Sequence, residues 1–413
     1  MTNPANFTPG SVFDERFAIE GPLGKGGWSF VYRAVHQPSG RACALKMLDA
    51  DKAEDEAFVE KFLAEASVLE KLTGHPHIVE LLGSGITDGG IAYVATELID
   101  GASMTRFIAD HAPCTWGVTQ RLINQIASGL DHAHQKKIIH RDLKPGNVLI
   151  AGQQSTMWTA KLLDFGIAKV VQQMMGESVT RVGTPVYCAP EQLGSSMREA
   201  AEQKGVTIAA HLSPATDVWP LALISFELLT GMKAKKYWGA RDLASVMLKA
   251  TMMDRVPPSE MAGDRSNLLP PGFDDWFMRC IRRNAAERYQ RAGDAAGELS
   301  ELLEGFADEP TMVRPAAQKP RKPPPPRSSV GGAGPVSSGS SLPRLDASDL
   351  EEEKRAFAAP PAPQSTPSAS NKTGSSMGPS LEELLEREKE QNKKLAIGVA
   401  IFIVLALVVY LVT

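Results

Sequence analysis

A glycine-rich turn near the start of the chain contains the first residues that could handle phosphate chemistry. The turn reads LGKGGWSFVY and contains Gly24, Gly26 and Gly27, with Ser29 where a third spaced glycine would complete G-x-G-x-x-G. It does not match a P-loop, since Gly-Lys is not followed by Ser or Thr. It does not match a dinucleotide fingerprint, because the next residues are typical of a strand rather than a helix. A glycine turn between two strands favours a flap over phosphates.

Lys46 lies in the apolar run ACALKML, on the strand expected after this turn. A strand lysine can simply be an exposed surface residue, which is the alternative interpretation. Its apolar neighbours indicate instead a half-buried ammonium group, and such a group needs an acid to hold it in place. We expect that acid to be Glu65, on the following helix.

Three later stretches concentrate acidic and amide side chains in short turns. They read IIHRDLKPGNVLI over residues 138–150, KLLDFGIAK over 161–169 and GTPVYCAPEQ over 183–192. Taken singly, such acids are typical of helix caps and exposed turns. In this order, after the glycine turn and Lys46, the set resembles the protein kinase superfamily across residues 17–306. The bacterial Hanks-type serine/threonine kinases are the most similar group.

Phosphoryl transfer develops negative charge on the γ-phosphoryl oxygens, so a catalyst mainly positions groups and neutralises charge. By the resemblance, Lys46 binds the α- and β-phosphates of ATP and pairs with Glu65. Asp142 accepts the proton of the attacking hydroxyl. Asn147 and Asp164 supply hard oxygen ligands of the kind that Mg²⁺ prefers, with Mn²⁺ as an alternative ion.

Lys144 narrows the expected substrate class. A lysine two residues after Asp142 resembles the serine/threonine kinases, whereas tyrosine kinases usually carry an arginine-containing variant there. By the same resemblance, Thr184 bridges Asp142 and Lys144. The implied reaction is transfer of the ATP γ-phosphoryl group to Ser and Thr hydroxyls of proteins. The alternative is a pseudokinase scaffold that binds nucleotide and partners but transfers little phosphate.

Further positions of the family motifs are expected to contact the nucleotide. Thr96 resembles a gatekeeper residue, and Glu97 and Ile99 resemble hinge residues whose backbone groups meet the base. For the apolar positions, ordinary core packing is a second and compatible interpretation. The full expected set is Leu23, Gly24, Lys25, Gly26, Gly27, Trp28, Ser29, Phe30, Val31, Ala44, Lys46, Thr96, Glu97, Ile99 and Leu149.

The resemblance also implies structural roles in the second half of this region. Glu191 is expected to pair with Arg288, and Asp217 to tie the catalytic loop to the next helix. Pro220 is expected in the first turn of that helix, where its missing N–H is tolerated. Residues 193–215 make a longer connection than in compact bacterial relatives, with substrate docking and an inert surface insertion as alternatives.

Arg141 precedes the expected catalytic acid and is the kind of residue that binds an anion. Phosphate on the activation segment, the stretch between Asp164-Phe165-Gly166 and Ala189-Pro190-Glu191, would supply that anion. The hydroxyl candidates there are Ser178, Thr180 and Thr184. We expect autophosphorylation at Thr180, with Ser178 as a second candidate, between two copies in a homodimer. The alternative is a surface loop with unmodified hydroxyls.

The segments that must position these residues predict an α+β fold, the bilobal fold of protein kinases. Runs of β-type residues at FAIEGPLG, SFVYRAVH, ACALKML and AYVATELI are separated by Gly, Pro and Asp. A helix over Asp55–Gly74 interrupts them, with one face formed by Phe58, Phe62, Ala66 and Leu69. Beyond Gly101 the pattern is mainly helical. Ligand clefts often form where a small β-rich lobe joins a larger helical lobe.

Composition and charge exclude some classes of partner. A hydrophobic content of 43% and a net charge of −4 describe a globular protein without a broad basic field, which argues against nucleic acid as a partner. The four cysteines make no C-x-x-C, so we expect reduced thiols in a cytosolic compartment. The N-terminal extension, residues 1–16, has no secretory pattern. A structural rather than metal-binding role is expected for His75, His77, His132 and His134.

Beyond the kinase-like region the composition changes. Residues 307–379, rich in Pro, Ser, Gly and Ala, predict a disordered linker whose RKPPPPR is either a docking ligand or a spacer. Residues 380–394 predict a short juxtamembrane helix, and the uncharged residues 395–412 predict a helix that spans one bilayer. A buried helix or a docking tail is the alternative. Because Lys393 and Lys394 precede the span, we expect a single-pass cell-membrane protein with the kinase facing the cytoplasm.

Overall fold

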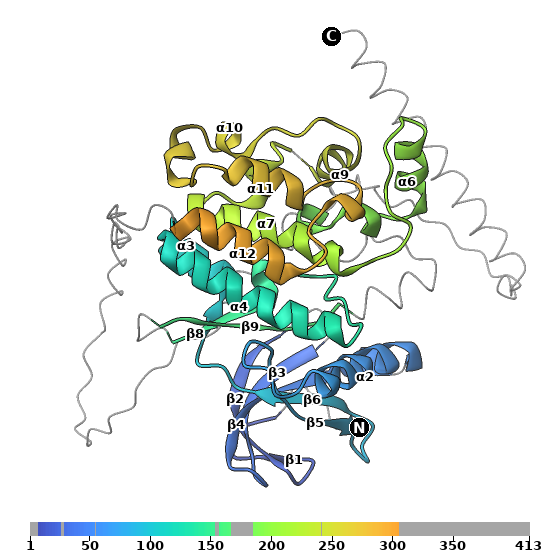
Figure 1. The fold of residues 1–413 in the computed structure, drawn as a ribbon. Coiled ribbons are helices and arrows are strands. Elements are labelled where there is room, and N and C mark those ends of the chain that lie inside the picture. Colours follow the sequence, from blue (N-terminus) through green and yellow to red (C-terminus); the bar gives the residue numbers. More distant parts are fainter. Residues whose placement is uncertain are drawn as a thin grey trace, which may run out of the picture. The chain divides into compact units, whose positions relative to one another are not determined.

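The six strands at the N-terminal end form one antiparallel sheet in the order β1-β2-β3-β4-β6-β5 (Figure 1). In the computed structural model these strands are β1 Val12–Phe13, β2 Phe17–Lys25, β3 Ser29–His36, β4 Arg41–Leu48, β5 Leu81–Ile86 and β6 Ala92–Glu97. The four strands predicted from sequence are confirmed, although β6 ends before Leu98. Period-two alternation buries one face of the sheet in an apolar cluster that includes Phe17, Tyr32, Leu45, Met47 and Tyr93.

The structure describes residues 7–25, 29–53, 55–152, 157–166, 185–240 and 242–304. The predicted linker, juxtamembrane helix and membrane span therefore lie outside the described residues. Within those residues, no helix combines the length and apolar character needed to cross a bilayer.

Helix α2, Glu56–Lys71, packs against β5 and β6. The helix begins after Asp55, whose side chain accepts a hydrogen bond from the Ala57 backbone at 3.0 Å. Phe62, Ala66 and Leu69 are buried as predicted, whereas Phe58 is only partly covered. A short helix α1, Ala50–Ala53, precedes it. Because the apolar face of α2 packs against the sheet, the polar residues of α2 are held in fixed positions beside it.

A second sheet of three short strands links the two lobes. It has the order β7-β8-β9, with β7 Gly101–Ser103, β8 Val148–Ala151 and β9 Thr159–Leu162. Leu162 bonds to the segment before β5: its N–H donates to His77 O at 2.9 Å and its C=O accepts from Val79 N–H at 3.0 Å. These bonds hold the end of β9 next to the six-stranded sheet.

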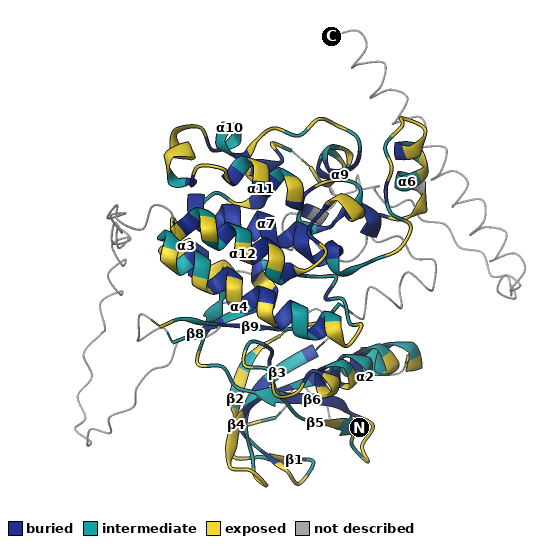
Figure 2. Ribbon diagram, viewed as in Figure 1, coloured by how far each residue is buried: buried dark blue, intermediate teal, exposed yellow. Residues whose placement is uncertain are grey.

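The helical lobe is built around α7, Pro214–Thr230, which is buried over nearly its whole length (Figure 2). Around it the main helices are α3 Met104–His111, α4 Trp116–Gln135, α11 Phe273–Cys280 and α12 Ala292–Glu304. Shorter helices are α6 Ser195–Glu202, α8 Ala234–Tyr237, α9 Leu243–Thr251 and α10 Pro258–Ala262. Short 3-10 turns are η2 Pro145–Asn147, η4 Pro185–Tyr187, η5 Pro190–Gln192, η6 Gly263–Leu268 and η7 Ala285–Glu287. Within the described residues this lobe carries the largest apolar core cluster.

Pro220 lies in the interior of α7, so its predicted place in the first turn is wrong. The helix begins earlier, with Ser213 as N-cap and Pro214 in the first turn. Ser213 N–H donates to Thr216 Oγ1 at 3.1 Å, and Thr216 N–H donates back to Ser213 O at 2.8 Å. Because Pro220 has no N–H, it cannot make the helical bond to the carbonyl four residues earlier. The longer connection at 193–215 contains α6 and contributes the buried side chains Ala201 and Ile208.

Candidate active site

Lys46 lies between two acids from different parts of the chain. From β4, its Nζ is 3.1 Å from Glu65 Oε2 on α2 and 3.7 Å from Asp164 Oδ1, which follows β9. The predicted pairing of Lys46 with Glu65 is confirmed. The Asp164 side chain remains 53% exposed, so a ligand can reach it.

Lys46, Glu65 and Asp164 shift one another's pKa values. Burial alone would lower the pKa of Lys46, but the charges of Asp164 and Glu65 outweigh it and the pKa is raised. Lys46 in turn holds the pKa of Asp164 well below its ordinary value. Burial, with the nearby charge of Asp164, raises the pKa of Glu65. Asp164 therefore stays ionised near neutral pH, which is the state that a cation ligand requires.

Asp142, Lys144 and Asn147 meet in the loop before β8. Asn147 Nδ2 donates to the Asp142 carboxylate and to the Asp142 backbone carbonyl, both at 2.9 Å. Lys144 Nζ is 3.3 Å from Asp142 Oδ2. With its amide nitrogen turned to Asp142, Asn147 keeps its side-chain oxygen for another partner. The bond from Asn147 fixes the direction of the Asp142 carboxylate, and the Lys144 ammonium group lies beside it.

The spacing between this loop and Asp164 is set by the strand pair that separates them. Val148 on β8 is directly opposite Leu162 on β9. Asn147 precedes Val148 and Leu163 follows Leu162, and the Leu163 N–H donates to Asn147 O at 2.9 Å. Two stretches that are far apart in sequence therefore present their polar side chains together.

Asp217 anchors the catalytic loop to α7. Its carboxylate accepts from the backbone N–H groups of His140 at 2.8 Å and Arg141 at 2.9 Å, and from His134 Nε2 at 2.7 Å. Burial would raise the pKa of Asp217, but its hydrogen bond and charge interaction with His134 bring the pKa below its ordinary value. Arg141 takes the left-handed backbone conformation, with φ of +66°. The predicted role of Asp217 as the tie between loop and helix is confirmed.

Five of the expected nucleotide residues share one face of the six-stranded sheet, namely Gly24, Val31, Ala44, Lys46 and Thr96. Val31 is opposite both Gly24 and Lys46, and Ala44 is opposite Thr96. Directly opposed residues point to the same side of an antiparallel sheet. This is the less buried side, because the alternating residues fill the core cluster.

The remaining nucleotide positions lie on or next to these strands, and Phe30 is on the core side, opposite Met47. Glu97 ends β6, and Ile99 follows it in the connection to β7. Leu149 on β8 is half-buried and opposite Lys161. Leu23 and Lys25 are in β2, while Ser29 and Phe30 open β3.

The serine in place of the third glycine is buried opposite Leu48, so a small residue is accommodated there. The Lys25 ammonium lies 4.5 Å from the ring centroid of Phe30. Four expected site residues lie outside the described residues, namely Gly26, Gly27, Trp28 and Thr184. The phosphorylation candidates Ser178 and Thr180 also lie outside them.

Two linked ion pairs near the end of β6 were not predicted. Lys161 Nζ donates to Glu97 Oε1 at 2.5 Å, and Glu97 Oε1 also accepts from Glu80 N–H at 2.9 Å. Arg41 holds the Glu80 carboxylate with two bonds of 2.9 and 2.7 Å. Sequence reading assigned only backbone groups of Glu97 to the site. The pairing of its side chain depends on β8–β9 packing, for which no local sequence signal exists.

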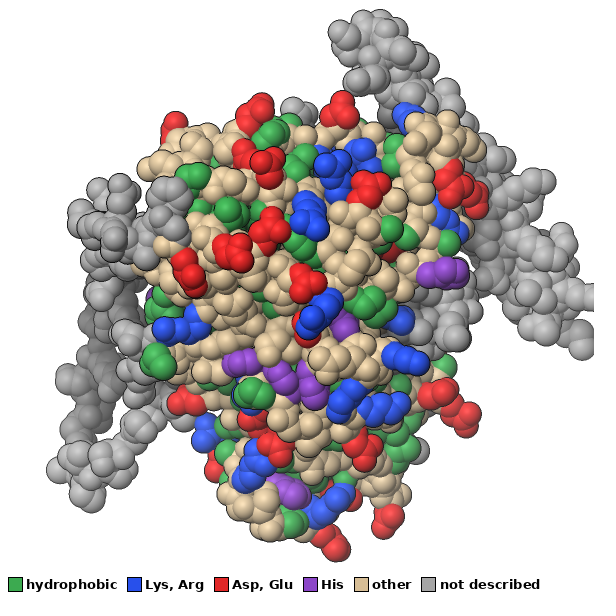
Figure 3. All heavy atoms as spheres, viewed as in Figure 1, with side chains coloured by type: hydrophobic (Ala, Val, Ile, Leu, Met, Phe, Trp, Pro, Cys, Tyr) green, Lys and Arg blue, Asp and Glu red, His purple; other side chains and the backbone are tan. Residues whose placement is uncertain are grey.

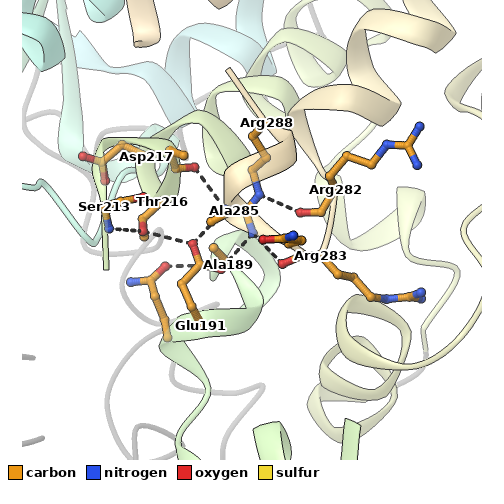
Figure 4. A network of polar contacts seen from close by, with 12 residues as sticks. Ala189, Glu191, Ser213, Thr216, Asp217, Arg282, Arg283, Ala285 and Arg288 are labelled. Atoms are coloured by element: carbon orange, nitrogen blue, oxygen red, sulfur yellow. Dashed lines mark hydrogen bonds and ion pairs between the residues drawn. The ribbon is translucent and has the colours of Figure 1, made fainter. Parts of the chain in front are cut away.

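Glu191 and Arg288 form the predicted ion pair in the helical lobe (Figure 4). Both Nη–Oε distances are 2.8 Å, and the two side chains are 0% exposed. Thr216 Oγ1 donates to Glu191 Oε1 at 3.0 Å, and Arg288 Nη1 donates to Ala215 O at 3.0 Å. The pair is satisfied by hydrogen bonds on both sides, which a buried ion pair requires.

Histidines gather where α4 approaches the β-rich lobe (Figure 3). His134 bonds to Asp217, and His77 Nδ1 is 3.1 Å from Ala160 O. The rings of His75 and His132 lie 4.9 Å apart, and burial together with their mutual charge lowers the pKa of His75 to about 4. In the described part of the chain, no group of three or more His, Cys, Asp or Glu side chains has metal-site geometry.

The sequence model of the protein kinase domain family matches residues 17–298 of the chain. The chain belongs to the protein kinase family. The matched range contains the Lys46–Glu65 pair, the Asp142 loop and Asp164.

Bacterial serine/threonine kinases are among the curated relatives of the chain. The serine/threonine-protein kinase PknF of Mycobacterium tuberculosis is 34% identical over 303 residues, covering 72% of this chain and 58% of PknF. A probable serine/threonine-protein kinase of Clostridium acetobutylicum is 29% identical over 301 residues, covering 73% of this chain and 42% of the relative. The match therefore spans only part of each relative's length. The resemblance to bacterial Hanks-type serine/threonine kinases is confirmed.

Solved structures agree with the fold. The kinase domain of Mycobacterium tuberculosis PknI is 25% identical, with a TM-score of 0.51, covering 72% of this chain and 99% of that domain. The predicted bilobal kinase fold is confirmed for the matched part of the chain.

Proposed function

We propose that this protein is an active ATP-dependent serine/threonine protein kinase. The observation that carries the proposal is the arrangement of Lys46 between Glu65 and Asp164, together with Asp142 held by Asn147. A scaffold that only bound nucleotide would have no need for a carboxylate fixed by an amide and a lysine. The names of the bacterial relatives support the serine/threonine class.

In the proposed reaction, the hydroxyl of a substrate Ser or Thr donates a hydrogen bond to Asp142. Its oxygen attacks the γ-phosphorus, the bond from that phosphorus to the β–γ bridging oxygen breaks, and ADP leaves with the electron pair. Asp142 takes the hydroxyl proton. Lys144, 3.3 Å from the Asp142 carboxylate, offsets negative charge at this point, and Lys46 binds the α- and β-phosphates.

Asp164 and Asn147 have the donor chemistry to hold Mg²⁺, or Mn²⁺ in its place. Asp164 is ionised and half-exposed, and Asn147 has its side-chain oxygen directed away from its bond to Asp142. A bound divalent ion would neutralise charge on the phosphates. Two protein ligands suffice for an ion that also binds substrate phosphates and water.

The test of activity compares the full chain with Asp142→Asn in a radiolabelled ATP assay on myelin basic protein. We expect the variant to lose about 100-fold or more in rate, the usual scale for removing a general base. Asp110→Asn is the matched control, because Asp110 is an exposed acid of α3, and it should retain the wild-type rate. Equal incorporation by wild type and Asp142→Asn would favour the scaffold, and phosphotyrosine as the product would contradict the substrate class.

We also propose that the kinase autophosphorylates at Thr180, with Ser178 as a second site, between two copies of the chain. Arg141 supports this, because burial lowers the pKa of its guanidinium and no acid of the described residues lies within ion-pair distance of it. Mass spectrometry after mixing wild type with Asp142→Asn should find phosphate on the inactive copy. A fully active protein unmodified at both sites would refute the proposal.

A single-pass membrane anchor at 395–412, with the kinase facing the cytoplasm, is the last part of the proposal. It rests on an uncharged segment preceded by Lys393 and Lys394. The full chain should stay with membranes after an alkaline carbonate wash, and a chain ending at residue 394 should not. Release of the full chain by that wash would contradict the anchor.

A further inference from the structure

Two arginines of the helical lobe have buried nitrogen atoms without a hydrogen-bond partner. They are Arg255, at Nη1, and Arg283, at Nε. Arg255 lies between α9 and α10, and Arg283 follows α11. Arg283 Nη2 donates to the backbone carbonyl of Met253, which brings it to the segment that carries Arg255. The two unsatisfied donors therefore belong to one cluster.

This cluster has more positive than negative charge. Burial, followed by the charge of Arg283, lowers the pKa of Arg255 to about 9, and the charges of Arg288 and Arg282 act in the same direction. Asp254 is the acid whose charge acts on Arg283. Across the described ranges, neither Arg255 nor Arg283 forms an ion pair. A buried charged donor without a partner is costly, so it points to a missing ligand.

The neighbouring Arg288 differs, because its guanidinium donors have hydrogen-bond partners. Its guanidinium is held by the Glu191 carboxylate at 2.8 Å and by backbone carbonyls of Arg282 and Arg283. In Figure 4 the side chains of Arg282 and Arg283 extend away from this pair. Arg288 is thus neutralised internally, while the neighbouring arginines are not.

The Arg255 guanidinium is held against a fully buried ring. It lies 5.6 Å from the ring centroid of Trp219, which stacks on Trp238 at 5.9 Å. Trp238 Nε1 donates to Val186 O at 2.9 Å, near the C-terminal end of the predicted activation segment, just before Ala189-Pro190-Glu191. Contact with the indole ring restricts the guanidinium, so less conformational entropy is lost when it binds an anion.

Lys and Arg side chains gather on the surface near α9 and α11 (Figure 3). Apolar side chains are exposed beside the arginines: Met253 and Val256 are each 37% exposed. A cationic centre with an apolar edge suits an anionic group carried on a peptide better than a free ion.

We propose that Arg255 and Arg283 form a binding site for a phosphoryl group carried on a serine or threonine of a protein. Guanidinium forks match phosphate geometry with paired N–H donors. A phosphorylated residue carries a charge of about −1.5 to −2, which two arginines balance better than they balance one carboxylate. Met253 and Val256 would contact the residues around the phosphorylated one. This binding does not depend on whether the chain transfers phosphate.

The test uses the full chain without ATP and a fluorescent peptide with one phosphothreonine among apolar residues. Fluorescence anisotropy should give at least about tenfold tighter binding than for the unphosphorylated peptide. Arg255→Met and Arg283→Met should each weaken binding about tenfold. Arg279→Met is the matched control, because Arg279 on α11 is already 3.4 Å from Glu298. It should change the affinity less than about twofold.

Arg255→Lys keeps the charge and removes the fork, so it should also weaken binding if the variant to methionine proves difficult to fold. Without peptide, Arg255→Met should unfold at or above the wild-type temperature, since an unpaired buried charge has been removed. Equal affinity for the two peptides, or unchanged affinity in both methionine variants, would overturn the proposal. Displacement of the peptide by inorganic phosphate at the peptide's own Kd would also overturn the assignment to a protein-borne group.

Discussion

Replacing Glu65 by glutamine should uncouple Lys46 from α2 while keeping the side-chain volume. Lys46 Nζ lies 3.3 and 3.1 Å from the two Glu65 oxygens and 3.7 Å from Asp164. A neutral amide leaves Asp164 as the only charged partner of the ammonium. Lys46 is then drawn toward Asp164 and away from the phosphates that it is proposed to bind.

The size of the effect follows from the contact that is lost. A hydrogen bond to a charged group contributes about 1.5–3 kcal/mol, and this one is half-buried and only partly screened. Since about 1.4 kcal/mol corresponds to a tenfold change in rate, kcat/KM for ATP should fall by about 10-fold to 150-fold.

Initial rates over an ATP titration measure this directly. Glu70→Gln is the matched control, because it removes the same charge from an exposed position of α2, and it should change kcat/KM less than about twofold. A Glu65→Gln enzyme within about threefold of wild type, or a control equally impaired, would refute the reasoning.

Three further substitutions test the fold and the hinge. Arg288→Met leaves Glu191 charged and buried, so the free energy of unfolding in urea should fall by about 3–5 kcal/mol, and a loss below about 1 kcal/mol would contradict this. Lys161→Met removes the partner of the Glu97 side chain next to the hinge, so KM for ATP should rise by up to about tenfold with a smaller change in kcat. An unchanged KM would show that the ion pair does not position the hinge. His75 has a pKa lowered from 6.5 to about 4, so the unfolded chain binds a proton in that interval while the folded chain does not, and stability falls as pH drops through it. His75→Gln should flatten that fall in urea unfolding measured at several pH values, and an unchanged slope would contradict the assignment.

Much of the active site was predictable because its residues stand in local patterns, and the resemblance of those patterns to kinase motifs implied their roles. Lys46 stands in a strand with apolar neighbours, and Asp142 and Asn147 occupy one short loop. The Asp55 cap and the apolar spacing of α2 place Glu65 on the helix. Such rules act over a few residues of chain, so they can be read before the fold is known.

Element boundaries were less predictable. The α7 helix starts at Pro214 because Ser213 and Thr216 cap it reciprocally, whereas the sequence reading placed Pro220 in its first turn. A proline inside a helix is tolerated when the rest of the helix is buried on all sides, as α7 is. Burial of that kind is a property of the assembled lobe.

By itself, the sequence determined the residue types, their order and the local elements that carry Lys46, Glu65, Asp142 and Asp164. Only the tertiary structure decided that Lys161 meets Glu97 and that Arg255 and Arg283 share a cluster with unsatisfied donors. The physical reason is that local rules act between residues a few positions apart, while these contacts join segments that only strand register and helix packing bring together.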